Sequence, residues 1–227
     1  MRRLGFIAVA AVGALLLAPS ASAVHPKTVD FIAGFEGYYA EPYNDPAGFA
    51  TVGYGHLIAY RPVRKSDRKL IWVRGQDNPG KLTEKEAKRL LRQDLAGYEA
   101  AVLERIGDTP VNRPMMTALT SFAFNLGPGY LDLKKSNGFT RTTHVAKKLR
   151  QRNYLGAARD MRIYDGVISG GKRYTLPGLT RRRNDEFKLM RQGIRRMEKC
   201  GTGCTDVPGS EVPAAPTPGN TGGVPIP

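Results

Sequence analysis

Three residues near the start of the chain have types and spacing that could carry out chemistry together. Glu36, Asp45 and Thr51 lie within the stretch FEGYYAEPYNDPAGFATVGYGH, residues 35–56. Glu36 stands among aromatic residues, and such a partly dry setting favours the protonated carboxyl group that a general acid needs. Asp45 lies in a polar turn, where we expect it to stay ionised. Two carboxyl groups with opposite tendencies suit cleavage of a glycosidic bond, in which one protonates the leaving oxygen and the other handles charge or water.

The same residues also have a purely structural interpretation. An amphipathic pattern after Pro26 predicts a helix that ends at Glu36, with Gly37 as its left-handed stop. Residues 38–58 combine aromatic and β-branched residues with turn residues, which predicts a small antiparallel hairpin region whose turn spans residues 44–48. On spacing alone, the two acidic residues could therefore be no more than a helix end and a turn.

The remainder of the chain predicts a mostly helical domain. Thr83 and Glu86 form a capping box, after which apolar residues recur at helical spacing as far as Gly107. At about 1.5 Å per residue this helix would be about 35 Å long, enough to connect two lobes. Further helices are predicted over residues 115–126, 140–152, 154–164 and 179–197.

One acidic residue of the long helix predicts a structural pair. Asp94 falls within the apolar stripe, between Leu91 and Tyr98, and an unpaired buried charge is costly. His56, at the end of the hairpin region, is the candidate partner. A catalytic base or a metal ligand is the alternative role for His56, but no second ligand stands close to it in the sequence. We therefore predict the structural pair.

Both ends of the chain differ in composition from its middle. Residues 1–23 combine a basic start, an apolar run and a small-residue site that ends at Ala23, which predicts a signal peptide and secretion. Cleavage after Ala23 and retention as an anchor are both compatible with this pattern. The apolar run is shorter than the roughly 20 residues that cross a bilayer, so we expect no stable membrane insertion. Residues 201–227 are rich in Gly and Pro without Lys or Arg, which predicts a disordered tail after a single domain at residues 24–200.

Charge and cysteine content suggest the partners and the compartment. The formal net charge of +15 attracts polyanions. For an exported monomer we expect anionic wall polymers or a membrane surface as partners, and we find no recognised nucleic-acid-binding motif. Cys200 and Cys204 are the only cysteines, and after export they predict a disulfide, with two free thiols as the alternative. Two ligands alone cannot form a zinc site, and we expect no metal and no organic cofactor.

The spacing of Glu36, Asp45 and Thr51 resembles the Glu-x8-Asp-x5-Thr signature of the phage-type lysozymes, glycoside hydrolase family 24. Further matches follow in the order of that family: GYGHL at 53–57, LTEKEAKRLLRQDL at 82–95, SFAFNLG at 121–127 and LPGLTRRRNDEFKLM at 176–190. The resemblance covers roughly residues 26–198. Several separated motifs in one order are far more specific than a single short pattern.

The resemblance implies an α+β, mostly helical, lysozyme-like domain of two lobes, with a small antiparallel hairpin sheet and a long interlobe helix. It also implies a muramidase that hydrolyses the β-1,4 bond between N-acetylmuramic acid and N-acetylglucosamine in peptidoglycan glycan strands. By analogy with the family, Glu36 is the acid, while Asp45 and Thr51 hold or activate the attacking water, with inversion at the anomeric carbon. The family also pairs a histidine after the glycine run with an aspartate of the long helix, which corresponds to His56 and Asp94.

Other positions and functions keep two interpretations. Asn125 falls where the family presents a polar side chain to the sugar, although a helix cap beside Gly127 is equally compatible. One arginine of the run 181–183 could approach Glu36, with the register left open, or the run could be a solvated face. Trp72 could stack on a sugar or serve packing. A lytic transglycosylase and a non-enzymatic cationic wall-binding protein on the same scaffold are the alternative functions.

Overall fold

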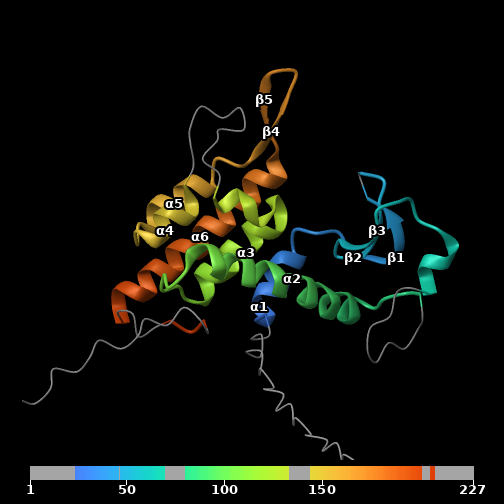
Figure 1. Ribbon diagram of the computed structural model, residues 1–227, viewed down its shortest axis with the longest axis horizontal. Coiled ribbons are helices and arrows are strands. Elements are labelled where there is room, and N and C mark those ends of the chain that lie inside the picture. Colours follow the sequence, from blue (N-terminus) through green and yellow to red (C-terminus); the bar gives the residue numbers. More distant parts are fainter. Residues whose placement is uncertain (1–23, 46, 70–79, 133–143, 201–204, 208–227) are drawn as a thin grey trace, which may run out of the picture.

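A long helix, α2 (Glu84–Ile106), joins a small lobe that carries a β-sheet to a larger helical lobe (Figure 1). The computed structural model describes residues 24–45, 47–69, 80–132, 144–200 and 205–207. α2 begins with the predicted capping box, in which the Thr83 backbone N–H donates to Glu86 Oε2 at 2.7 Å and Thr83 Oγ1 accepts from the Glu86 N–H at 3.3 Å. The helix ends at Ile106, and Gly107 is its C-cap. The prediction of a long interlobe helix is confirmed.

The small lobe contains α1 (Pro26–Ala33), a three-stranded antiparallel sheet and the short 3-10 helix η1 (Lys65–Lys69). The strands β1 (Tyr39–Asn44), β2 (Ala50–Gly53) and β3 (His56–Ala59) lie in the order β1-β2-β3. The central strand packs on the first half of α2, and α1 closes the same core. The buried side chains of this core include Val29, Ile32, Val52, Leu82, Ala87, Leu91 and Leu95.

The large lobe is built around α3 (Arg113–Leu126), which packs against α2 and α6 (Pro177–Cys200). The short elements η2 (Pro128–Leu131), α4 (Val145–Arg150) and α5 (Tyr154–Met161) complete its helical part. The second half of α2 contributes to this core, so α2 serves both lobes. The buried side chains of the large-lobe core include Val102, Ile106, Met115, Leu119, Phe122, Leu149, Met161 and Met190.

A two-stranded hairpin in the large lobe was not predicted from the sequence. β4 (Gly166–Ser169) pairs with β5 (Lys172–Thr175), and the hairpin projects from the helices at the top of Figure 1. Gly170 and Gly171 form the turn with φ angles of 56° and 74°, a conformation that glycine adopts without steric cost. A Gly-Gly pair between two short segments is the local sequence signal of such a hairpin.

α1 ends earlier than the sequence pattern predicted. It ends at Ala33 rather than at Glu36, and Gly37 is not in the left-handed conformation that was predicted for it. Gly34 is the C-cap instead, and the N–H groups of Phe35 and Glu36 donate three residues back, to Ile32 O and Ala33 O, in a tighter turn than an α-helix. Glu36 therefore lies in a turn beyond the helix.

Two other predicted boundaries also differ. α6 begins at Pro177, before the predicted residue 179, because proline suits the first turn of a helix. α4 and α5 are shorter than predicted within the described residues. They are separated by Arg152, which has a positive φ of 58°, and by Asn153, whose side chain caps α5.

Several predictions fall on residues outside the described ranges, namely the signal peptide at 1–23, Trp72, Cys204 of the predicted disulfide with Cys200, and most of the tail at 201–227. Residues 205–207 of that tail are described and contact the domain. Asp206 Oδ1 accepts from the Arg113 N–H at 2.6 Å, and Val207 is buried in the large-lobe core. For these three residues the prediction of disorder was wrong, because the Asp206 carboxylate binds the amino end of α3 and the Val207 side chain packs into the large-lobe core.

Within the described ranges, every helix is too short or too polar to cross a membrane.

Candidate active site

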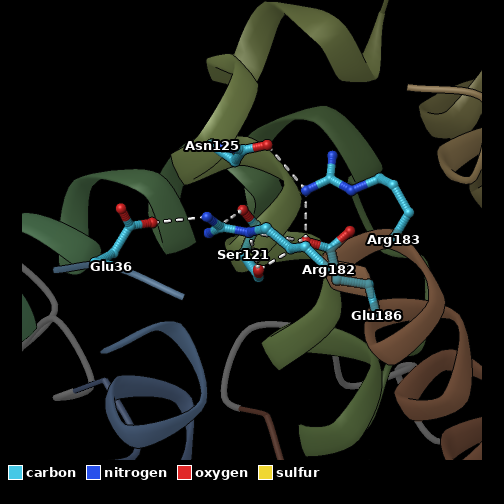
Figure 2. A network of polar contacts seen from close by, with 6 residues as sticks. All are labelled: Glu36, Ser121, Asn125, Arg182, Arg183 and Glu186. Carbon is cyan, nitrogen blue, oxygen red and sulfur yellow. Dashed lines mark hydrogen bonds and ion pairs between the residues drawn. The ribbon is translucent and has the colours of Figure 1, made fainter. Parts of the chain in front are cut away.

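Glu36 follows α1 and reaches toward the large lobe. The backbone N–H groups of Phe35 and Glu36 donate to Ile32 O at 2.9 Å and Ala33 O at 3.3 Å, which holds the turn after the helix. The Glu36 side chain keeps 26% of its surface exposed. Its Oε1 accepts from Nη1 of Arg182 at 2.6 Å (Figure 2). Glu36 is thus an accessible carboxyl group held by one strong charge-assisted hydrogen bond.

The structure fixes the register of the arginine run at 181–183. Arg182 is the member that binds Glu36, and it also donates from Nε to Ser121 Oγ and from Nη2 to Ser121 O, both at 3.2 Å. The guanidinium groups of Arg181 and Arg182 both lie over the Phe35 ring, 5.4 Å and 5.2 Å from its centroid. Arg183 turns into the large-lobe interior, where it is almost fully buried. One arginine therefore positions the acidic residue from α6.

Arg182 is held in place by a buried network that includes Ser121, Arg183 and Glu186 (Figure 2). Oε1 of Glu186 accepts from Ser121 Oγ at 2.7 Å and from Nη2 of Arg183 at 2.8 Å. Burial raises the pKa of Glu186 to about 7, although Arg183, the Ser121 hydroxyl and Arg182 oppose the rise. Burial likewise lowers the pKa of Arg183 to about 10. Ser121, Arg183 and Glu186 were not assigned individual roles from the sequence, and the signal was the i, i+3 and i+4 spacing of 182, 183 and 186 on one helix.

Asn125 belongs to the same network. Its Oδ1 accepts from Nη2 of Arg183 at 3.1 Å. The C-cap of α3 is Gly127, whose N–H donates to Ala123 O at 2.8 Å, so the Asn125 side chain does not provide the cap. Contact of Asn125 with a sugar stays a prediction.

Asp45 and Thr51 lie in the turn and the central strand of the small sheet. Oδ1 of Asp45 accepts from the backbone N–H groups of Ala47 at 2.9 Å and Phe49 at 2.8 Å, which is the turn role that the sequence allowed. Within the described residues Oδ2 of Asp45 has no hydrogen-bond partner. Thr51 is buried in β2 and its hydroxyl donates to Phe49 O at 3.1 Å. Both residues are therefore fixed by Phe49 while each keeps acceptor capacity.

Tyr43 lies beside the segment that holds Asp45 and Thr51. It is the direct β1 partner of Thr51 in β2. Its pKa is raised mainly by burial, and Tyr39, Asp45 and Glu36 raise it further. A shared catalytic role of Glu36, Asp45 and Thr51 stays a prediction.

His56 and Asp94 also lie together, as the sequence predicted. Nδ1 of His56 is 2.9 Å from Oδ2 of Asp94, which connects β3 to α2. Their side chains keep 35% and 27% of their surface exposed. In the described part of the chain, His, Cys, Asp and Glu side chains do not gather in threes as metal ligands would.

The two carboxyl groups have different surroundings that suit acid–base chemistry. The Glu36 carboxyl group is accessible and bound by an arginine, while Asp45 is held through one oxygen in a turn and has its other oxygen available. The first group can deliver a proton and the second can hold a water molecule.

Comparisons with known proteins find relatives over most of the chain. Residues 33–186 match the family described as phage lysozyme. An endolysin of Acyrthosiphon pisum secondary endosymbiont phage 1 is 28% identical over 166 residues, which cover 73% of this chain and 96% of that protein. The solved muramidase domain of SpmX from Asticaccaulis excentricus is 26% identical with a TM-score of 0.57, covering 74% of this chain and 96% of that one. The endolysin from Escherichia coli O157:H7 phage FAHEc1 is 28% identical with a TM-score of 0.55, covering 74% and 92%.

Proposed function

Because the chain belongs to the phage lysozyme family, we propose that it is an exported muramidase that hydrolyses the β-1,4 bond between N-acetylmuramic acid and N-acetylglucosamine. The family and its endolysin and muramidase relatives identify a cell-wall lytic enzyme whose substrate is peptidoglycan. The observation that carries the finer proposal is the accessible Glu36 carboxyl group bound by Arg182, together with the turn that holds Oδ1 of Asp45 through two backbone amides.

Glu36 is the proposed general acid. It gives its proton to the glycosidic oxygen as the bond between that oxygen and the anomeric carbon breaks. Arg182 then stabilises the carboxylate that remains, through the hydrogen bond of 2.6 Å. Ser121 holds the guanidinium from the other side, so the charge does not have to reorganise during the reaction.

Asp45 and Thr51 are proposed to act on the attacking water. Two backbone amides hold Oδ1 of Asp45, so Oδ2 accepts the proton of the water. The Thr51 hydroxyl donates to Phe49 O and therefore offers its lone pairs to the second water proton. A water that attacks from the face opposite the leaving group inverts the anomeric carbon, and this geometry requires carboxyl groups about 6.5–9.5 Å apart.

Mass spectrometry of fragments released from purified peptidoglycan tests the reaction. Fragments with reducing N-acetylmuramic acid ends are expected from the native protein, and NMR of the fresh product should detect the α-anomer first. Glu36→Gln should abolish release, while Glu104→Gln should not, because the Glu104 side chain is 82% exposed on α2. Anhydro-muramic ends would instead identify a lytic transglycosylase. Wall lysis that survives Glu36→Gln would favour a non-enzymatic cationic wall-binding protein.

Export is tested separately by expressing the full chain in a bacterium. The proposal predicts that the protein leaves the cytoplasm and has lost residues 1–23, as measured by its intact mass. Recovery of the full mass from the membrane fraction would identify an anchor, and retention in the cytoplasm would contradict export.

A further inference from the structure

An irregularity in β1 places two tyrosines side by side. Tyr39 pairs with Gly53 of β2, whereas Tyr43 pairs with Thr51, and the register shifts between them. The tyrosines are four positions apart in β1 while their partners are two apart, so the additional β1 residues form a bulge. Pro42 lies in this bulge, where the absence of its N–H costs no ladder hydrogen bond.

The bulge brings the two rings into contact. Residues four apart in a regular strand are separated by about 13 Å, at about 3.3 Å per residue. The Tyr39 and Tyr43 rings instead stack with centroids 3.9 Å apart and planes 24° apart. Residues directly opposite each other in antiparallel strands share a face of the sheet, so the stacked rings lie on the face that carries Thr51. The other face carries Val52, which is buried in the small-lobe core.

The stacked pair adjoins the segments that carry the two carboxyl groups of the site. A β-carbon added to Gly37 would be 3.0 Å from Cε2 of Tyr39, so this ring covers the backbone immediately after Glu36. Tyr43 stands two residues before Asp45. Tyr39 nevertheless keeps 47% of its surface exposed. A large aromatic surface is thus fixed at the site and left open to solvent.

We propose that Tyr39 and Tyr43 form a sugar-binding platform that holds one pyranose ring of the glycan next to the bond that is cleaved. The electron-rich face of an aromatic ring attracts the C–H groups of a sugar, and each phenol hydroxyl can donate to a hydroxyl or acetamido oxygen. The stacking between the two tyrosines fixes the ring that receives the sugar, so little conformational entropy is lost on binding. This inference rests on the proposed function, because that function supplies the glycan.

Binding to the full chain carrying Glu36→Gln tests the platform without turnover. The probe is a soluble tetrasaccharide of alternating N-acetylglucosamine and N-acetylmuramic acid, measured by isothermal titration calorimetry. Adding Tyr39→Leu should raise the Kd about tenfold, the loss expected for one favourable aromatic contact. Adding Tyr39→Phe, which keeps the ring, should change the Kd less than about threefold. Tyr174→Leu is the matched control, because Tyr174 is 52% exposed, similar to Tyr39, and lies in β5 of the large lobe outside the stacked pair.

The outcomes separate the platform from the proposed function. If the Glu36→Gln protein binds the tetrasaccharide and Tyr39→Leu does not weaken binding, the platform is wrong while the glycan substrate stands. If Tyr39→Phe weakens binding as much as Tyr39→Leu, a hydroxyl contact replaces the platform. If no tetrasaccharide binds at all, the proposed substrate is wrong and the platform falls with it. A second measurement does not depend on the leucine variant being folded. NMR of the Glu36→Gln chain follows the ring protons of Tyr39 and Tyr43 as the tetrasaccharide is added. If these resonances do not shift, the proposal is overturned.

Discussion

Replacing Glu186 by glutamine should make the protein less sensitive to pH. Glu186 is fully buried, and its Oε1 accepts from Ser121 and Arg183. Its Oε2 is buried without a hydrogen-bond partner among the described residues. Arg182 is the other nearby cation, 3.4 Å away, but it also serves Glu36. Arg182 and Arg183 together therefore do not offset the cost of burying the Glu186 carboxylate. Burial raises the pKa of Glu186 to about 7.

The sign of the effect follows from proton binding. In the unfolded chain Glu186 loses its proton near its ordinary pKa of 4.5, whereas in the folded protein it keeps the proton until about pH 7. Between these values the folded state binds more protons, so the free energy of unfolding falls as the pH rises. A change in pKa from 4.5 to about 7, at about 1.4 kcal/mol for each pH unit, corresponds to roughly 3–4 kcal/mol in total, most of which is lost between pH 4.5 and pH 7.5. Glutamine mimics the neutral carboxyl and should remove this contribution.

Urea denaturation at pH 4.5 and at pH 7.5 measures the contribution of Glu186 to the pH dependence of stability. The free energy of unfolding of the native protein should fall by about 3 kcal/mol more between these two pH values than that of Glu186→Gln. Asp185→Asn is the control on the same helix, because Asp185 pairs with Lys188 at the surface and should contribute less than about 1 kcal/mol. If the deficit of Glu186→Gln grows with pH, the two arginines stabilise the charged form more than burial opposes it, and the reasoning is refuted.

Three further substitutions test other parts of the structure. Asp45→Asn keeps the acceptor of the turn, so the free energy of unfolding should change by less than about 0.5 kcal/mol while peptidoglycan hydrolysis falls at least about 100-fold; unchanged hydrolysis would remove Asp45 from the mechanism. Thr83→Ala removes the N-cap of α2 and should cost about 1 kcal/mol in urea denaturation, and no loss would mean that the capping box is not stabilising. Asp94→Asn should cost about 1 kcal/mol, and a double-mutant cycle with His56→Asn should show a coupling of similar size; additive effects would contradict the pair.

The sequence predicted the parts of the fold that depend on local patterns. The limits of α2 followed from a capping box at one end, a glycine at the other and regular apolar spacing between them. Partners far apart in sequence were predictable only where burial demanded one specific kind of group. Asp94 was such a case, because a carboxylate on an apolar stripe needs a cation or a hydrogen-bond donor, and few candidates were available.

Features that depend on tertiary packing could not be predicted in the same way. Consecutive residues of a helix point about 100° apart, so the three arginines at 181–183 face different directions, and only the packing of α6 on α3 decides that Arg182 meets Glu36. The bulge that stacks Tyr39 on Tyr43 could not be predicted either, because the order of polar and apolar residues along β1 does not indicate the extra residues.

The contacts of α1 determine which lobe holds Glu36. α1 contributes Val29 and Ile32 to the small-lobe core, yet it also packs against α3, where Thr28 Oγ1 and Thr117 Oγ1 form a buried hydrogen bond of 2.7 Å. Glu36 follows directly and is bound by Arg182 of α6. Glu36 is therefore fixed to the large lobe at two points, whereas Asp45 and Thr51 belong to the small sheet and its turn. A movement of the sheet relative to the helices would leave the bond between Glu36 and Arg182 intact and change the separation of the two carboxyl groups, the distance on which an inverting reaction depends.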